Sequence, residues 1–323
     1  MELTIGIAVY NGENYIDRCI TSILRAYKNI PSKKLRLQII AVNDGSKDNS
    51  ESILAEYKKK YDFIKVINKE NGGPSSSRNK IIEQCNTKYL WFVDVDDEIE
   101  LDSFKYLLTQ NLAEINMFNY STYTYNGNVV ENNSITDMDE KDIKLIAYRT
   151  PSPWHFIFST EFIKGTRLYF LENVFYEDLN YILKITSKVE KIKWFDKPIY
   201  RYYLSQNSIM RSNSLSKKID IFLVFNDAIA YYKKNNIYES NYAELEYTAI
   251  HHLLYVGYLD VFKIDEKSEL LDQYKKYLNE NFPNWQHNKY YKKISLKRKL
   301  IYCLIVANSK RTLSLILKIM KLH

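Results

Sequence analysis

The sequence predicts an α/β fold with a mainly parallel sheet flanked by helices, followed by a helical C-terminal region. Over roughly the first 100 residues, short apolar runs alternate with amphipathic stretches, which is typical of strand–loop–helix repeats. Residues 89–93 are an unbroken apolar and aromatic run, as expected of a strand buried on both faces. After residue 212, apolar and tyrosine positions recur at helical spacing. We therefore expect one domain at 1–211 and a helical region at 212–323.

The first 93 residues hold three strand–loop–helix units followed by a fourth strand. Strands are expected at 3–9, 37–42, 64–67 and 90–93, with helices from residue 15, at 52–61 and at 78–84. Such alternation implies right-handed crossovers and a parallel sheet, whose ligand crevice lies outside the carboxyl ends of the strands. The loops at those ends carry the polar groups of the sequence, namely Tyr10, Asn11, Asn43–Ser46, Asn71–Gly73 with Arg78, and Asp94, Asp96 and Asp97.

The glycines and the acidic residues narrow the kind of site. None of the eight glycines has the spacing of a dinucleotide-binding fingerprint or a P-loop, so a dehydrogenase and a P-loop ATPase are disfavoured. Asp94, Asp96 and Asp97 follow the strand at 90–93 and bring negative charge to one sheet edge. A hard cation or sugar hydroxyls are natural partners for such a cluster, and a solvated acidic turn is the alternative.

The composition indicates which kinds of partner to expect and in which cellular compartment the protein works. Residues 281–323 hold ten Lys/Arg and no Asp/Glu, so residues 1–280 carry 36 Lys/Arg against 39 Asp/Glu, a net charge of −3. The overall charge of +7 therefore belongs to the tail, and we expect no nucleic-acid partner. Three scattered cysteines suggest a reducing compartment, and residues 1–9 do not resemble a signal peptide. A cytoplasmic location is expected.

Several stretches, taken in order, resemble glycosyltransferase family 2, the inverting transferases of the GT-A fold. The matching segments are AVYNGENYIDRCITSIL, IIAVNDGSKDNS, NKENGGPSSSRN, WFVDVDDEI, FYEDLNYILK and IYRYYLSQNSIM, which together cover roughly residues 3–211. Ala8 stands where the family usually has Pro. The Q-x-x-R-W signature of processive polysaccharide synthases is absent from the sequence. The resemblance therefore implies addition of one sugar, or a few, per encounter.

The resemblance implies a site for a UDP-sugar donor. Asp44 would accept a hydrogen bond from the uracil ring N–H, with a turn-forming role in Asn43–Ser46 as the alternative. Arg78, expected at the start of a helix beside a glycine-rich loop, would face a phosphate, with a surface ion pair as the alternative. The segment 200–211 resembles one that closes over the diphosphate. The other implied donor contacts are the wall around the base, Val9, Tyr10 and Asn11, and the weaker phosphate contacts Arg201, Ser208 and Arg211.

The resemblance also distributes the catalytic and metal-binding roles. Asp96 would contact the ribose or donor sugar and share with Asp97 a Mn²⁺ or Mg²⁺ ion that bridges the diphosphate, and Asp94 would support them. Asp178 would be the general base, and Glu177 would orient hydroxyl groups. The alternative for this pair is two acidic residues that simply begin a helix, where they favour the macrodipole.

The remaining expectations concern the acceptor and the tail. Trp154 could stack on an acceptor sugar, although a core tryptophan is the commoner case. Residues 289–323 are compatible with a basic amphipathic helix that lies on an anionic membrane, as a peripheral protein on its inner face would. The alternative is a tail packed on its own domain or on a second copy in a homo-oligomer.

Together these features predict a metal-dependent inverting hexosyltransferase of bacterial capsule, exopolysaccharide or other surface-glycan synthesis, with a saccharide acceptor on a lipid carrier. A catalytically silent sugar-nucleotide- or glycan-binding partner of another transferase is the rival hypothesis. A nucleotidyltransferase is a weaker rival, because the first loop, Tyr10–Gly12, lacks the basic, glycine-rich sequence that such an enzyme needs.

Overall fold

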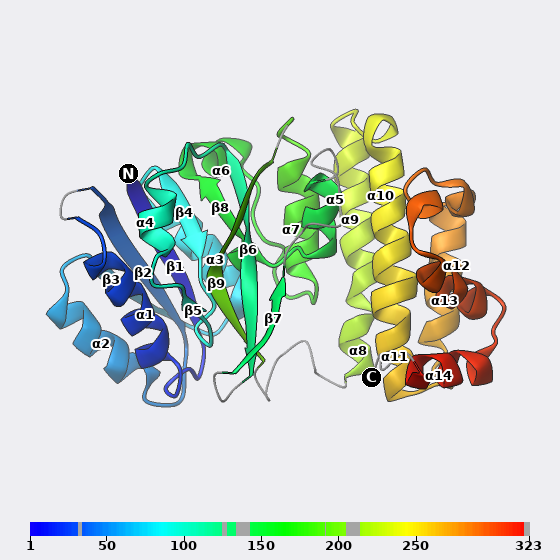
Figure 1. Ribbon diagram of the computed structural model, residues 1–323, viewed down its shortest axis with the longest axis horizontal. Helices are drawn as coiled ribbons and strands as arrows, with labels where there is room; N and C mark the ends of the chain where they lie inside the picture. The colour runs from blue at the N-terminus through cyan, green and yellow to red at the C-terminus, as the bar shows by residue number, and fades with distance from the viewer. Residues whose placement is uncertain (32–33, 125–127, 134–142, 191, 205–213, 320–323) are drawn as a thin grey trace. The chain divides into compact units, whose positions relative to one another are not determined.

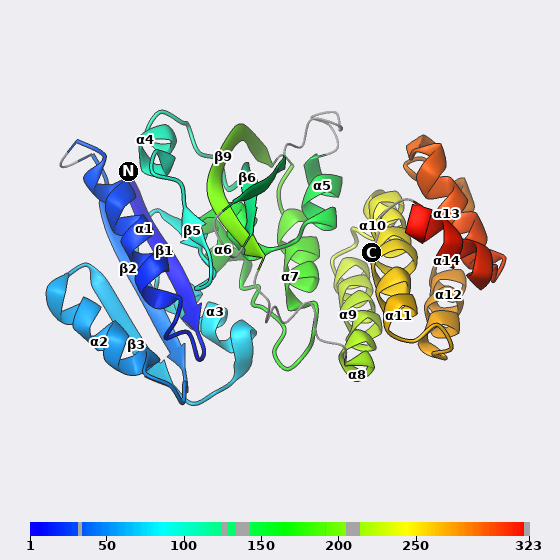
Figure 2. The same cartoon turned by 60° about the horizontal axis from the view of Figure 1, so that its bottom comes forward.

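The computed structural model describes residues 1–31, 34–124, 128–133, 143–190, 192–204 and 214–319. The chain divides into two compact units, Met1–Asn173 with Glu177–Arg211, and Val174–Tyr176 with Ser212–His323. Figures 1 and 2 show the first unit as an α/β structure and the second as helices. Within the described residues, no helix combines the length and the apolar character needed to cross a membrane.

The first unit begins with four parallel strands in the order β3-β2-β1-β4. Leu3, Ile5 and Ile7 of β1 join the core formed with α1 and α2, while Gly6 faces α3. A Cβ on Gly6 would lie 2.5 Å from Ile81 Cγ2, so glycine at this position permits the close approach of α3 to β1. The bounds of these elements are β1 (Glu2–Val9), α1 (Ile16–Lys28), β2 (Arg36–Asp44), α2 (Ser50–Lys60), β3 (Ile64–Lys69), α3 (Gly73–Gln84) and β4 (Tyr89–Phe92).

The sheet continues beyond β4 with mixed pairing. β8 pairs antiparallel with β4 and with β6, β6 and β9 are parallel, and β5 and β7 pair antiparallel with β9 and β6 respectively. The parallel arrangement predicted from the sequence therefore applies to β1–β4. The further elements are β5 (Glu98–Ile99), α4 (Ser103–Leu107), β6 (Ile115–Thr124), β7 (Val129–Asn133), α5 (Ile143–Arg149), β8 (Phe156–Ser159), α6 (Thr160–Thr166), α7 (Glu177–Thr186) and β9 (Lys193–Leu204).

The described residues of the second unit form helices and their connecting turns, with no strand among them. A continuous rod runs from α10 through the π-helical segment η5 into α11, where Gly257 makes room for Tyr274 of α12. Within this unit, α13 and α14 lie on the side away from α9 in both views (Figures 1 and 2). The helices are α8 (Leu215–Lys218), α9 (Asp220–Lys234), α10 (Tyr242–Ala249), η5 (Ile250–Gly257), α11 (Tyr258–Ile264), α12 (Leu270–Asn281), α13 (Leu296–Val306) and α14 (Lys310–Ile319).

One predicted boundary is wrong. The stretch Gly73–Ser77 belongs to α3, which begins at Gly73, and not to the preceding loop. Pro74 stands at the first turn, where its missing N–H costs no intrahelical bond. Arg78 consequently lies inside α3 and not at its N-terminus.

Candidate active site

The loops that follow β1 and β2 are joined by hydrogen bonds at the carboxyl edge of the sheet. Asn11 has a left-handed backbone (φ 49°); its N–H donates to Ser46 Oγ (3.0 Å), and its side-chain oxygen accepts from Lys47 N (2.9 Å). Tyr10 is 49% exposed beside this junction. Val9, predicted to border the base, has its side chain in the core, so only its main chain could face a ligand.

Asp44 organises the start of α3. Its buried carboxylate accepts hydrogen bonds from the N–H groups of Gly72 (3.0 Å) and Gly73 (2.8 Å) and forms an ion pair with Lys69. The carboxylate thus engages orphan N–H groups at the N-terminus of α3, which favour an anion. The uracil contact of Asp44 stays a prediction, and a base would have to share this carboxylate with three protein donors.

Arg78 brings together carboxylates that are far apart in the sequence. One guanidinium nitrogen donates to Glu177 Oε1 (2.7 Å), and the other lies 3.5 Å from Asp94 Oδ1. Burial alone would lower the pKa of Arg78, but Asp94, Glu177 and Asp178 outweigh it and raise that pKa. Arg78 is therefore a permanently charged bridge between the end of β4 and the start of α7.

Glu177 and Asp178 form the first turn of α7, directly after Tyr176, whose φ of 68° is unusual for a bulky residue. The Asp178 carboxylate accepts a hydrogen bond from Leu179 N (2.7 Å). Burial and the negative charge of Glu177 raise the pKa of Asp178 from 3.8 to about 7, although Leu179 N–H and Arg78 oppose the change. A carboxyl group that titrates near neutral pH can exchange a proton with a bound substrate.

The three aspartates after β4 have unequal surroundings. Asp97 is 1% exposed; its Oδ1 accepts from Tyr203 N (2.7 Å) and its Oδ2 from the Tyr200 hydroxyl (2.7 Å). Burial, together with Asp96 and Asp94, raises the pKa of Asp97. Asp94 and Asp96 are partly exposed. Across the part of the chain that the structure describes, no three Asp, Glu, His or Cys side chains converge as a ready-made metal cage.

Two residues predicted to contact ligands have protein partners in the structure, and their ligand contacts stay predictions. Trp154, expected to stack on an acceptor, is 6% exposed and stacks instead on Tyr200 (centroids 4.5 Å apart, 7° between planes). Arg201, expected to meet phosphate, is paired with Glu100 (2.7 Å) and lies 3.9 Å from Glu98 across the β5–β9 pairing. Ser208 and Arg211 lie outside the described residues.

Three residues at this edge escaped the sequence reasoning. Tyr200 donates to Asp97 and accepts from Asp94 N (3.1 Å), so it fixes the acidic loop. Arg18 of α1 donates to the Asp96 carbonyl and lies 3.4 Å from Glu98. Lys69 pairs with Asp44. All three residues occur within the matching segments quoted above, and that was the only available signal; the helical spacing around Arg18 gave it no special role.

A parallel half-sheet with convergent carboxylates at its carboxyl edge, a mixed second half and a following helical region define a GT-A-type glycosyltransferase. The chain belongs to glycosyl transferase family 2, whose model matches residues 4–175. The predicted family and fold class are thus confirmed.

The similar proteins agree with this placement. The uncharacterized glycosyltransferase EpsJ of Bacillus subtilis is 31% identical over 220 residues, which are 64% of this chain and 62% of that protein. The poly(ribitol-phosphate) beta-glucosyltransferase of Bacillus spizizenii is 41% identical over 101 residues, 31% of this chain and 15% of that protein. The chain thus matches less than two thirds of the length of either relative. Staphylococcus aureus TarS 1-349 in complex with UDP shares the fold, with a TM-score of 0.70 at 20% identity over 99% of this chain and 91% of that one.

Proposed function

We propose that the protein is a metal-dependent, inverting glycosyltransferase that moves a hexose or N-acetylhexosamine from a UDP-sugar to a saccharide acceptor. Membership of family 2 supports sugar transfer. The observation that carries the proposal is the meeting of Arg78, Asp94 and the Glu177–Asp178 pair at one sheet edge, with the pKa of Asp178 near neutrality.

Inversion at the anomeric carbon is a single displacement, in which a base removes the proton of the acceptor hydroxyl as the new bond forms. We assign this role to Asp178. Its pKa of about 7 makes the carboxylate a stronger base than an ordinary aspartate, yet one still ionised in half or more of the molecules at and above that pH. Glu177 holds Arg78 in place and contributes to the raised pKa of Asp178.

The donor half of the site is proposed to use Arg78, Asp94 and Asp96. Arg78 carries a fixed positive charge next to the acidic loop, where a diphosphate could exchange with its present carboxylate partners. TarS, which shares the fold, was crystallised with UDP and with UDP-GlcNAc, and this supports a uridine donor here.

The oxygen ligands at this edge fit Mn²⁺ or Mg²⁺. Asp94 and Asp96 would hold the ion, and the diphosphate would supply further oxygens. When bound, the ion would neutralise charge on the departing UDP. Asp97 was predicted to share the ion with Asp96, but a metal at Asp97 would compete with the two hydrogen bonds from β9. We therefore assign Asp97 to positioning the acidic loop.

The acceptor is proposed to be a saccharide of a bacterial capsule, exopolysaccharide or wall polymer, built on a lipid carrier at the inner face of the membrane. The names of relatives support this class, since they include the poly(ribitol-phosphate) beta-glucosyltransferase and a teichoic acid poly(glycerol phosphate) polymerase.

The test is UDP release from a panel of UDP-sugars, with Mn²⁺, Mg²⁺ or chelator, for the wild type, Asp178→Asn and Asp96→Asn. Asp62→Asn, at an exposed position outside the site, is the matched control. We expect metal-dependent release from one donor, lowered about 10²- to 10⁴-fold by Asp178→Asn while calorimetric UDP binding persists. Full transfer by both site variants would refute the proposal. UDP binding without turnover on any donor would favour the silent-subunit alternative.

A further inference from the structure

The last two described helices form a hairpin. Ser295 caps α13 by accepting from Arg298 N (3.4 Å), and Asn308, with φ 54°, reverses the chain before α14. Each helix is attached by a short buried row. These rows are Ile301, Tyr302 and Ile305 in α13 and Leu313 and Leu317 in α14.

The opposite face of each helix is exposed and apolar. In α13, Leu296 (83% exposed), Leu300 (47%) and the exposed Cys303 follow one another at i, i+4 and i+7, which places them on one face. In α14, Leu315 (59%) and Ile319 (72%) repeat the pattern at i and i+4. A helix on the surface of a globular protein normally exposes charged or polar residues. In α13 and α14 the exposed rows are apolar instead.

Cations border both exposed apolar faces. Lys297 and Lys299 flank the row in α13, and Arg311 and Lys318 flank the row in α14. Among the described residues from 281 to 319 there are nine Lys/Arg and no Asp or Glu. An acidic protein partner would account for the cations but not for the exposed apolar side chains between them. A partner that is anionic at its surface and apolar inside accounts for both.

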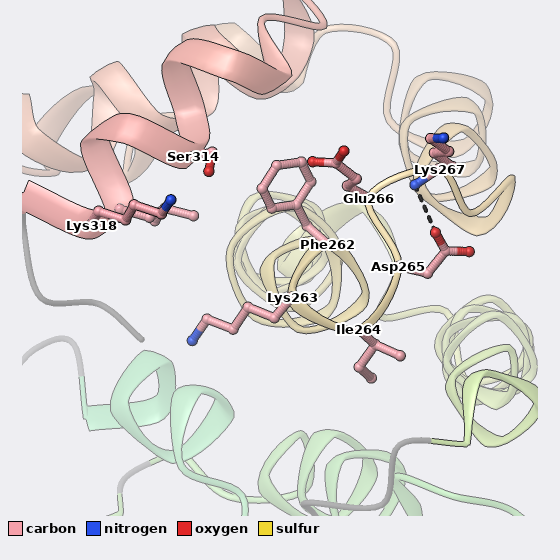
Figure 3. A pocket seen from close by; sticks show the side chains of 9 residues that line it. Phe262, Lys263, Ile264, Asp265, Glu266, Lys267, Ser314 and Lys318 are labelled. Carbon is pink, nitrogen blue, oxygen red and sulfur yellow. Dashed lines mark hydrogen bonds between the residues drawn. The ribbon is translucent and has the colours of Figure 1, made fainter.

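A hollow of about 440 Å³ lies beside α14, lined by the end of α11 and the turn after it (Phe262–Lys267) and by Ser314, Leu317 and Lys318 (Figure 3). Asp265 in this hollow accepts from Lys267 N (2.9 Å), and Glu266 adds a second carboxylate to the lining. The hollow is lined by both acidic and basic groups, and none of the proposed site residues lines it. We therefore do not regard it as a second candidate for the active site.

We propose that the outward face of α13 and α14 binds an anionic lipid surface, with Leu296, Leu300, Leu315 and Ile319 in the interface and the bordering lysines and arginines at the headgroups. Lipid binding by this face needs no transfer activity. Either proposal can therefore fail while the other stands.

The test is co-sedimentation of the full chain with vesicles of phosphatidylcholine alone or mixed with phosphatidylglycerol. We expect binding to the anionic vesicles that weakens with salt, because surface charge attraction is screened. The apolar double variant Leu296→Ser/Leu315→Ser and the charge variant Lys297→Glu/Arg311→Glu should each lower partitioning at least about tenfold. The matched control is Leu101→Ser, which removes a leucine that is 50% exposed in the other unit and should bind like the wild type.

A cooperative urea-unfolding transition of every variant verifies that the chain has folded. Equal binding to both kinds of vesicle, or binding unchanged in both double variants, would overturn the proposal. So would a dimer in sedimentation velocity that Leu296→Ser/Leu315→Ser dissociates, in the absence of vesicle binding, because the face would then serve a second copy of this chain.

Discussion

Replacing Asp178 by Asn should impair catalysis and stabilise the fold at the same time. The folded chain holds the Asp178 proton up to a pH of about 7, whereas an ordinary aspartate loses it near 3.8. The unfolded chain therefore releases this proton first, and the free energy of unfolding falls as pH rises from about 4 to about 7 and stays reduced above that. Asparagine does not ionise, so the variant avoids this loss.

The magnitude follows from the pKa. A change from 3.8 to about 7 corresponds to at most about 4 kcal/mol at alkaline pH. The side chain is partly exposed, so solvent screening reduces this. Asn also loses the favourable interaction of a carboxylate with the N-terminus of α7, about 0.3–1 kcal/mol. We expect a net gain of roughly 1–3 kcal/mol at pH 8 and no gain near pH 4.

The assay is urea unfolding of both proteins at pH 4.5 and pH 8, followed by the fluorescence of the four tryptophans, beside the rate of UDP release at pH 8. The wild-type rate should fall tenfold per pH unit below about 7, as the base becomes protonated. An Asp178→Asn variant that is less stable at pH 8 than the wild type would refute the electrostatic reasoning. A rate unchanged by the substitution would refute the role of Asp178 as base.

Three further outcomes are expected from the surroundings of the site. Tyr200→Phe removes a donor to the buried Asp97, so it should cost about 1–3 kcal/mol of unfolding free energy; unchanged urea stability would contradict this. Asp220→Ala removes the acceptor of Phe175 N (2.8 Å), two residues before Glu177, and misplacement of the base should lower the rate about tenfold or more with UDP affinity retained. Gly6→Ala should force α3 outward, costing about 1–3 kcal/mol and weakening calorimetric UDP binding; unaltered affinity would show that α3 tolerates the methyl group.

The parallel half of the sheet was predictable because each of its strands is a short apolar run closed by a polar loop. The start of α3 was not, because Gly72, Gly73, Pro74 and three serines are typical of loops. Proline at the first helical turn fits a helix start equally well, and the N–H groups that Asp44 accepts from decide between the two.

Their positions in the sequence could not show which of the three aspartates after β4 is buried. All three follow one strand, and the chain turns tightly there, with Asp97 N donating to the Asp94 carbonyl (3.1 Å). Asp97 is buried because Tyr200 and Tyr203, more than 100 residues later, return on β9 and donate to it. A single sequence shows neither that pairing nor the burial that follows from it. Trp154 was ambiguous for the same reason, since its neighbour Tyr200 comes from β9.

The proposed acid–base function depends on which of three nearby carboxylates Arg78 contacts directly. Arg78 places one guanidinium nitrogen 2.7 Å from Glu177 and another 3.5 Å from Asp94, whereas Asp178 has the N–H of Leu179 as a hydrogen-bond donor. Desolvation and the neighbouring charge of Glu177 raise the pKa of Asp178, and the Leu179 N–H and Arg78 offset this only in part. A diphosphate that drew Arg78 towards itself would weaken the effect that now lowers the pKa of Asp178. The arriving donor would therefore strengthen Asp178 as a base just as its substrate becomes available.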